Sequence, residues 1–200
     1  MGKVVLYMSM SLDGFIAGPN AGPGNGLGDG GHRLHEWFLT GAEAGHQGAA
    51  ARLTGVNREV MDELMATGAV VVGRRTFELA GGWGGDHHGG VPVFVLSRHQ
   101  PDARMRWPAV TYVSDVAIAM RLAKDGAGEK DVLVHGARTA RLALAAGVLD
   151  ELQIHLIPVL LGQGHRLFAD MPPDHIELEL LRAVDGLGVQ HLRYRVRSVG

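Results

Sequence analysis

Three short aliphatic runs, each ending in a turn with basic and hydroxyl side chains, constrain the fold of this chain more than any other feature. The first run, Val70–Gly73, leads directly into Arg74–Thr76, and the second is Val93–Arg98. The third, Val132–Thr139, contains a glycine turn and then a helical stretch. Strands that alternate with helices are typical of a sheet with parallel strands. The sequence therefore predicts an α/β fold.

The ends of these runs also predict a binding site. Parallel strands place their carboxyl ends at one edge of the sheet, where ligands of open α/β folds bind. The ends of the three runs carry Arg74, Arg75, Arg98 and Arg138. The first amides of a helix have no intrahelical acceptor and can bind phosphate. A helix start with solvated arginines is the alternative for any single junction. Three junctions together favour a dinucleotide, and the guanidinium groups favour one with an additional 2′-phosphate.

The composition fits one globular domain over residues 1–200 and excludes several classes of function. Of the 200 residues, 46% are hydrophobic and 20% are charged, which suffices for a sizeable core. A net charge of −2 without a basic run argues against nucleic-acid binding. No apolar stretch has membrane-spanning length, and the N-terminus is typical of a strand. We therefore expect a cytoplasmic protein that binds no membrane.

Eleven histidines raise the question of a metal site. His32 and His35 have helical i, i+3 spacing, and His87 and His88 are adjacent in a loop. The chain has no HExxH motif and no cysteine, and histidines in loops are usually solvated. We therefore expect neither a dedicated metal site nor a disulfide.

The remaining pattern completes the expected sheet. Strands are predicted at Lys3–Ser9, 69–73, 92–97, 110–113, 132–135 and Glu151–Leu161, followed by a C-terminal hairpin of 176–184 and 189–199. Pro158 within the last long strand predicts an edge position or a bulge. Helices are predicted at His32–Leu39, from an Asn57 cap to about Thr67, from a Ser114 cap to about Gly126, and at Thr139–Ala146. The result is a mostly parallel sheet that ends in an antiparallel pair.

Glycine-rich stretches interrupt this pattern near the N-terminus. Residues 18–31 contain seven glycines and two prolines and cannot bury a core. They predict a mobile loop, which could serve as a lid beside a binding site. Asp13 precedes it and, with Gly14, is interpreted as a turn residue. Residues 40–56 are rich in glycine and alanine and give no clear prediction.

Three segments resemble a known family. Met8–Ala17, Gly73–Thr76 and Leu152–Phe168 are similar, in order and spacing, to stand-alone bacterial relatives of the reductase domain of the riboflavin-biosynthesis deaminase-reductase. That group shares the three-layer dihydrofolate reductase fold. The resemblance implies an NADPH-dependent oxidoreductase related to 5-amino-6-(5-phosphoribosylamino)uracil reductase. Such an enzyme would transfer a hydride to a small heterocyclic or carbonyl substrate. The resemblance also implies a homodimer.

The resemblance assigns cofactor contacts to four segments. It implies that the pyrophosphate and the 2′-phosphate are held by Gly73, Arg74, Arg75 and Thr76, and that the adenosine end is lined by Leu96, Ser97 and Arg98. It further implies that the pyrophosphate is cradled by Gly136, Ala137, Arg138 and Thr139, and that the nicotinamide carboxamide meets Ser9, Ile16 and Ala17. The family commonly has a second glycine where this chain has Ala137. That methyl group would displace the cofactor, or be tolerated at a negative backbone φ.

Hydride transfer needs a proton donor near the cofactor, and there are two candidates. By resemblance, the strand at Glu151–Leu161 passes the substrate pocket, and its alternation could direct His155 toward it. The alternative for His155 is a core histidine that is hydrogen-bonded to backbone. Glu36 lies in the region where dihydrofolate reductase carries its acid, or it is a solvated helix residue. The alternative function is a nucleotide-binding protein without turnover.

Overall fold

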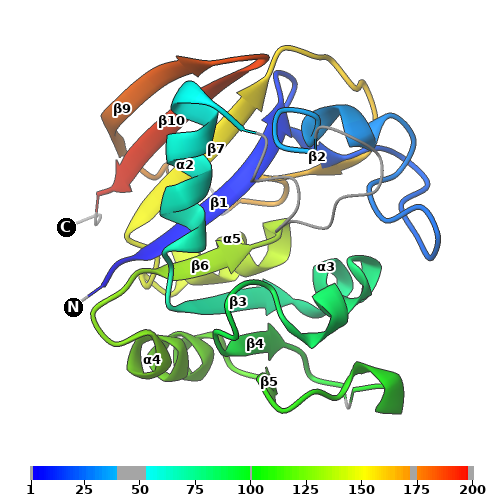
Figure 1. Cartoon of the computed structure of the whole chain (residues 1–200), viewed down its shortest axis with the longest axis vertical. Coiled ribbons are helices and arrows are strands. Elements are labelled where there is room, and N and C mark those ends of the chain that lie inside the picture. Colours follow the sequence, from blue (N-terminus) through cyan, green and yellow to red (C-terminus); the bar gives the residue numbers. More distant parts are fainter. Residues whose placement is uncertain (1, 40–52, 100, 172–174, 198–200) are drawn as a thin grey trace.

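The strands form one large sheet. The computed structural model describes residues 2–39, 53–99, 101–171 and 175–197. Within them, an eight-stranded sheet has the order β5-β4-β3-β6-β1-β7-β10-β9 (Figure 1). Its strands are β1 (Val4–Ser11), β3 (Ala69–Gly73), β4 (Val93–Leu96), β5 (Val110–Val113), β6 (Val132–His135), β7 (Glu151–Ile157), β9 (Leu178–Gly186) and β10 (Val189–Val196). The short strands β2 (Phe15–Ala17) and β8 (His165–Arg166) pair with each other.

Strand direction confirms the predicted topology. The strands β1, β3, β4, β5, β6 and β7 run parallel to one another. By contrast, β10 is antiparallel to both β7 and β9. The sheet is therefore mostly parallel and ends in an antiparallel hairpin. Its six parallel strands place their carboxyl ends at the same edge.

Helices cover both faces of the sheet, which gives the three layers of the expected dihydrofolate reductase-like fold. On one face lie α4 (Val116–Ala127) and α5 (Ala137–Ala145), and on the other lies α2 (Gly55–Met65), in front of the sheet in Figure 1. The short helix α3 (Arg74–Leu79) follows β3 directly, and single 3-10 turns occur at Gly31–Leu34, Gly81–Gly85 and Ala103–Met105. No helix in the described ranges is long and apolar enough to cross a membrane.

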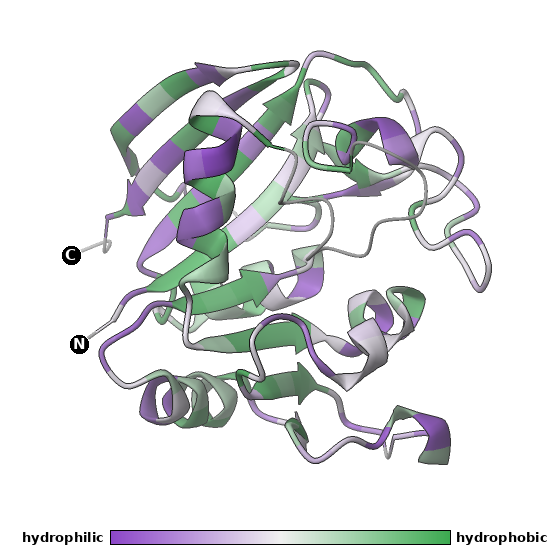
Figure 2. Cartoon of the chain, viewed as in Figure 1, coloured by the Kyte–Doolittle hydropathy of each residue, from purple (hydrophilic) through white to green (hydrophobic). Residues whose placement is uncertain are grey.

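The two core layers follow the alternation of side chains along β1. Val4 and Leu6 belong to the cluster under α4 and α5, whereas Val5 and Tyr7 belong to the cluster under α2. All four side chains are at most 2% exposed. Figure 2 shows the matching pattern, with hydrophobic central strands and hydrophilic residues on the visible side of α2. Because β1 is buried on both faces, it provides a rigid support for the polar Ser9 at its carboxyl end.

Two predicted helix caps were wrong. Asn57 lies inside α2 rather than at its cap, and its carboxamide is buried, with Nδ2 donating to the carbonyl oxygen of Trp37 at 3.3 Å. The cap of α4 is Asp115 rather than Ser114, because the Asp115 carboxylate accepts a backbone N–H of the first turn at 2.9 Å. The N-cap of α2 is Thr54, and Asn57 instead bonds to distant partners. In α4 the cap moves to the adjacent residue, which has a similar capping propensity.

The strand β7 is an interior strand, contrary to the prediction from Pro158. It lies between β1 and β10 and ends at Ile157, so the proline follows the strand instead of interrupting it. Helix α5 also begins earlier than expected, at Ala137 rather than Thr139. Because β7 ends before the proline, all seven of its residues pair with β1.

The glycine-rich segment 18–31 is held together by side-chain hydrogen bonds. The amide groups of Asn20 and Asn25 donate to the Asp29 carboxylate at 2.6 and 2.9 Å. The guanidinium group of Arg75 donates to the carbonyl oxygen of Ala21 at 3.0 Å, which joins the segment to α3. Its mobility stays a prediction. Of the stretch that gave no clear prediction, residues 40–52 lie outside the described ranges.

Asp13 acts as a turn residue, as the sequence indicated. Its carboxylate accepts hydrogen bonds from Ser11 Oγ at 2.6 Å and from the amides of Leu161 at 3.1 Å and Gly162 at 2.7 Å. The hydrogen bond from Ser11 is the largest of the effects that lower the pKa of Asp13 to about 2. Asp13 therefore stays ionised and joins the turn after β1 to the segment that follows β7.

Candidate functional site

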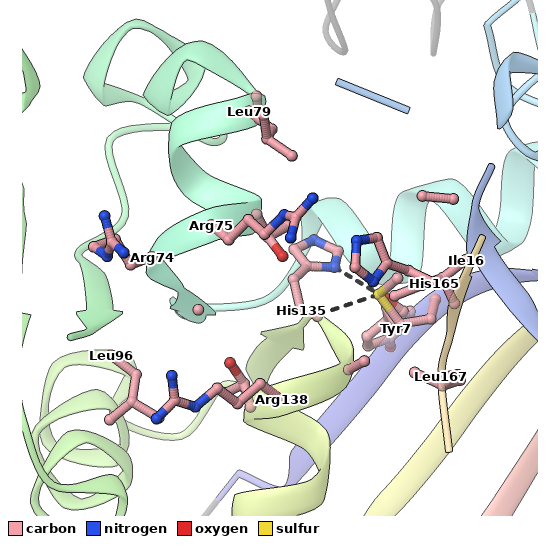
Figure 3. A pocket seen from close by; sticks show the side chains of 18 of the residues that line it. Tyr7, Ile16, Arg74, Arg75, Leu79, Leu96, His135, Arg138, His165 and Leu167 are labelled. Atoms are coloured by element: carbon pink, nitrogen blue, oxygen red, sulfur yellow. Dashed lines mark hydrogen bonds between the residues drawn. The ribbon is translucent and has the colours of Figure 1, made fainter. Parts of the chain in front are cut away.

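A large cavity opens at the carboxyl ends of the parallel strands. Its volume is about 1580 Å³, which exceeds the roughly 300–1,000 Å³ of most sites for one small ligand. It is lined by every residue predicted to bind the cofactor, namely Ser9, Ile16, Ala17, Gly73, Arg74, Arg75, Thr76, Leu96, Ser97, Arg98, Gly136, Ala137, Arg138 and Thr139. In Figure 3, Arg74 and Leu96 lie toward one end of the pocket and Tyr7 toward the other.

Two strand–helix junctions of equal spacing, Gly73–Thr76 and Gly136–Thr139, face each other in this cavity. They follow the neighbouring strands β3 and β6. The Thr139 hydroxyl approaches Gly73 so closely that a Cβ atom there would lie 3.0 Å from Oγ1, and Thr76 approaches Gly136 in the same way. Thr139 Oγ1 is buried and has no hydrogen-bond partner among the described residues. A bound ligand could satisfy it.

Basic side chains surround these junctions. Arg74 forms an ion pair with Glu78 within α3, with Nη1 and Oε1 3.1 Å apart, whereas Arg75 donates to the loop carbonyl described above. Arg98 and Arg138 are exposed. All four arginines line the cavity. Since α3 has only six residues, the longer helix α5 provides the better N-terminus for an anion, and the arginines supply most of the positive charge.

Ala137, where the family commonly has glycine, fits the backbone at this position. It is the first residue of α5, and the described non-glycine residues with positive φ are Asn20, Trp83 and Asp170. The methyl group is therefore tolerated by the backbone, which is one of the two outcomes that the sequence left open. The positive φ of this turn belongs instead to Gly136, at +93°, a value that favours glycine.

The other end of the cavity is aromatic. Trp37 Nε1 donates to Ser9 Oγ at 2.9 Å, and the Trp37 ring centroid lies 4.6 Å from that of His155. Ser9 and His155 are register partners on β1 and β7. Tyr7 lines the same region, and burial raises its pKa to about 12, so its hydroxyl stays protonated. The sequence gave no signal for Tyr7, because an aromatic residue in a buried strand normally packs.

His155 reaches the cavity, but as a neutral side chain. Its ring is 2% exposed, and its Nδ1 lies 2.8 Å from Nδ1 of His191 on β10. Burial, and then the neighbouring His191, lowers the pKa of His155 well below its ordinary value. A neutral imidazole is a poor acid, so the structure opposes the predicted role of His155 as proton donor. The alternative, a core histidine that is hydrogen-bonded to backbone, is confirmed only in its burial, because the partner of His155 Nδ1 is another histidine.

Glu36, the other predicted proton donor, does not reach the cavity. Its side chain is 60% exposed and forms an ion pair with Arg33, with Oε2 and Nη1 3.3 Å apart. The cavity is lined by the residues on either side of it, His35 and Trp37, but not by Glu36. The structure therefore does not bring the two predicted catalytic residues together, and it places Glu36 in the solvated role.

A chain of three histidines beside the cavity was missed from the sequence. His87 Nδ1 lies 2.7 Å from His88 Nδ1, and His87 Nε2 lies 3.1 Å from His135 Nε2. The chain ends on backbone oxygens, with His88 Nε2 at 3.1 Å from Thr67 O and His135 Nδ1 at 2.9 Å from Tyr7 O. His87 and His88 are thus buried, not solvated as expected. The sequence offered two partial signals, the adjacent pair His87 and His88 and the position of His135 directly before Gly136.

The nitrogens of these histidines face one another rather than a common point. Among the described residues, no group of three or more histidine, aspartate or glutamate side chains could hold a metal ion. Burial lowers the pKa of His88, and the hydrogen bond to the Thr67 carbonyl group opposes this shift. The chain therefore supports the wall of the cavity by hydrogen bonding.

A family model agrees with this arrangement. The model of the RibD C-terminal domain matches residues 2–187. The chain belongs to the RibD C-terminal domain family. This membership confirms the resemblance that the motifs indicated, and the matched residues include both glycine–threonine junctions of the cavity. No protein of curated function matches the sequence.

Solved structures show the fold of this RibD C-terminal domain. A Shewanella sp. PV-4 protein named for riboflavin biosynthesis matches with a TM-score of 0.69 and 19% identity, over 99% of this chain and 100% of its own. Acinetobacter baumannii RibD matches with a TM-score of 0.63 and 17% identity, over 99% of this chain and 59% of its own. A third match is the Thermotoga maritima diaminohydroxyphosphoribosylaminopyrimidine deaminase/5-amino-6-(5-phosphoribosylamino)uracil reductase. Its TM-score is 0.59 and its identity 15%, over 98% of this chain and 57% of its own. The chain thus spans somewhat more than half the length of the last two proteins.

Proposed function

We propose that this RibD C-terminal domain protein is an NADPH-dependent reductase that transfers a hydride to a small heterocyclic or carbonyl substrate. The proposed reaction is related to that of 5-amino-6-(5-phosphoribosylamino)uracil reductase. The observation that carries the proposal is the pair of facing glycine–threonine junctions, lined by four arginines, at one end of a cavity whose other end is aromatic. The volume of about 1580 Å³ suits a dinucleotide together with a small substrate.

The residues at the junctions fit such a cofactor. A side chain on Gly136 would fill the space beside Thr76, and the buried Thr139 hydroxyl lacks a partner that a phosphate oxygen could provide. The pyrophosphate would be held by both junctions and the N-terminus of α5, and the 2′-phosphate by Arg74, Arg75 or Arg98. When bound, NADPH supplies the hydride.

The aromatic end of the cavity would bind the substrate. Trp37 and Tyr7 line this end and offer flat surfaces to a planar ring. Ser9 is fixed by its hydrogen bond from Trp37, and it can direct its own proton toward a ligand. With His155 neutral and Glu36 outside the cavity, the proton that completes the reduction would come from solvent or from the substrate itself.

We also propose that the protein is a homodimer. Leu178 and Leu180 at the sheet edge are 43% and 56% exposed. They pair with Val196 and Tyr194 of β10. A bulge interrupts the alternation of side chains along β9, so that these two leucines face away from α2. As a result, an apolar surface forms on the face of the hairpin opposite α2, and a second copy of the chain could cover it.

A fluorescence titration with NADPH and NADH, followed by an NADPH-oxidation screen, tests the proposed reductase. We expect tight NADPH binding and oxidation in the presence of a pterin, an aminopyrimidine or a quinone. Absence of nucleotide binding would refute the proposal. Binding without oxidation of NADPH by any of these substrates would favour the alternative function, a cofactor-binding protein without turnover.

A further inference from the structure

An asparagine and two histidines form a buried hydrogen-bonded chain that ends in the cavity. Asn57 Nδ2 lies 3.3 Å from the carbonyl oxygen of Trp37 and 3.2 Å from that of Leu187. Both oxygens are acceptors, so the amide nitrogen belongs at this position and Oδ1 lies on the other side of the carboxamide. Oδ1 faces His191 Nε2 at 3.1 Å. Because Oδ1 can only accept, His191 carries its proton on Nε2.

This proton fixes the direction of the next hydrogen bond. Burial, and then the Arg182 guanidinium, lowers the pKa of His191 to about 4, so its imidazole is neutral near pH 7. A neutral imidazole has one protonated nitrogen, and His191 Nδ1 is therefore an acceptor. It lies 2.8 Å from His155 Nδ1, which must donate. His155 is neutral as well, so its lone pair is on Nε2.

The Nε2 atom of His155 is buried and has no hydrogen-bond partner in the part of the chain that the structure describes. His155 lies on β7, between His191 of β10 on one side and Ser9 of β1 on the other. The two nitrogens of an imidazole point in diverging directions, so Nε2 points away from β10. His155 lines the cavity, and a ligand there is the partner that this acceptor lacks.

The glycine at the hairpin turn holds this chain in place. A Cβ atom on Gly186 would overlap Asn57 Oδ1 and would lie 2.8 Å from His191 Nε2. The backbone of β9 therefore packs directly against the contact between the two side chains, which limits how far either can rotate. The protonation pattern is thus built into the fold, at three positions that are at most 5% exposed: Asn57, His155 and His191.

We propose that His155 Nε2 is a hydrogen-bond acceptor for the substrate and selects a nitrogen heterocycle that carries an amino group or a ring N–H at this point. A carbonyl oxygen in the same place would face the lone pair and be rejected. Trp37, beside His155, offers the ring a surface on which to pack. His155 is thus a specificity-determining residue and not the acid. This inference rests on the proposed function, which places a substrate in this cavity.

The protonation pattern can be measured by NMR on the unaltered protein, labelled with ¹⁵N-histidine, near pH 7. We expect His155 to show a protonated Nδ1 and an unprotonated Nε2, the reverse of the tautomer that predominates in free histidine. The spectrum of a His155→Gln variant identifies the His155 signals. A protonated Nε2 would overturn the inference, whether or not the protein binds NADPH.

Two probes of equal shape test the selectivity. 4-Aminopyrimidine carries an amino group where 4-methylpyrimidine carries a methyl group, and their binding can be followed by ligand-observed NMR with and without saturating NADP⁺. We expect the amino compound to bind about tenfold more tightly, as one hydrogen bond would allow. In His155→Leu the preference should disappear, and in His155→Gln, whose side-chain oxygen can accept, part of it should remain.

The outcomes separate the two proposals. Equal binding of the two probes, or binding of neither, would overturn the inference about His155. A preference for the amino compound in a protein that binds no NADPH would refute the proposed function while supporting the acceptor role. Because the NMR measurement and the wild-type titration need no variant, a failure of His155→Leu to fold would not affect the decision.

Discussion

A Cβ atom on Gly136 would lie 2.7 Å from Oγ1 of Thr76, closer than side chains normally approach. Gly136 also has a φ of +93°, in the region that favours glycine. The reciprocal pair differs, because Gly73 has an ordinary φ of −73° and its Cβ would lie 3.0 Å from Thr139 Oγ1. Of the two junction glycines, Gly136 is therefore the one that leaves no place for a side chain.

We expect Gly136→Ala to lower the free energy of unfolding by about 2–3 kcal/mol, because it combines a strained φ with a steric overlap. Urea denaturation measures the effect. The matched control is Gly147→Ala after α5, which has a φ of +64° and nothing within 4 Å of the added methyl group. It should cost only the backbone strain, about 1 kcal/mol. Equal effects of the two substitutions would contradict the steric argument.

The contribution of Thr76 can be isolated with a double-mutant cycle. In a Thr76→Ala background the hydroxyl is absent, and the next atom of Thr76 that the Gly136 methyl group would meet lies at 3.6 Å. Gly136→Ala should therefore cost less in that background than in the wild type, with a coupling energy on the order of 1 kcal/mol. Strict additivity in urea denaturation would show that the two residues do not interact.

The junctions could be predicted from the sequence because their signals are local. A β-branched strand, a glycine, arginines and a threonine within eight residues indicate a strand end at a binding edge, and the structure brings Gly73, Thr76, Gly136 and Thr139 together there. The parallel order of the strands follows from the same alternation of elements. Short-range chemistry thus determines most of the fold and one end of the cavity.

The other end of the cavity could not be predicted in the same way. Its hydrogen bonds join residues that are far apart in the chain, such as Asn57 with His191 and His87 with His135. No local pattern indicates that a strand histidine will meet a second histidine, or that a helix asparagine will accept from it. Glu36 shows the reverse case, in which a residue near the right place in sequence points to solvent.

We expect the protein to bind NADPH more tightly than NADH, because Arg74, Arg75 and Arg98 line the phosphate end of the cavity. Replacing Arg74 or Arg98 with Ala should weaken NADPH binding by roughly 1.5–3 kcal/mol and affect NADH less. The control is Arg121→Ala on α4, an exposed arginine outside the cavity. Equal affinity of the parent for the two nucleotides in a fluorescence titration would refute the prediction.

Stability should fall in mild acid. The pKa of His191 is lowered to about 4 in the folded protein, mainly by burial, whereas its ordinary value is 6.5. The unfolded chain therefore binds the proton first, and the stability present above pH 6.5 is lost as the pH falls toward 4, up to about 3 kcal/mol. Urea denaturation between pH 7 and pH 4.5 measures this loss.

A pair of variants checks that His191 is responsible. His191→Gln removes the buried titrating group, so its stability should depend less on pH than that of the wild type. His175→Gln changes a histidine whose side chain is 90% exposed and should leave the pH dependence unaltered. A wild-type stability that is constant from pH 7 to pH 4.5 would argue that His191 is not held neutral by the fold.

Segment 18–31 should exchange its amide hydrogens faster when its contact with α3 is removed. Arg75→Ala deletes the hydrogen bond to Ala21, whereas the control Arg74→Ala deletes an ion pair inside α3 and leaves the segment untouched. We expect faster exchange in Arg75→Ala only, and slower exchange in the wild type when NADPH is bound. Slow exchange in the wild type without nucleotide would contradict the predicted mobility of this segment.

The proposed dimer predicts that a charge on the apolar face of the hairpin yields monomers. Leu180 is 56% exposed on β9 and points away from α2, whereas Arg182, beyond the bulge, pairs with Glu63 of α2 at 2.6 Å. Leu180→Glu would bury an unpaired carboxylate in the interface, so dissociation is expected. Leu160→Glu, at a leucine that is 69% exposed outside the hairpin, is the matched control and should stay dimeric. Light scattering at micromolar concentration distinguishes the 21.3 kDa chain from its dimer, and a monomeric wild type would refute the proposal.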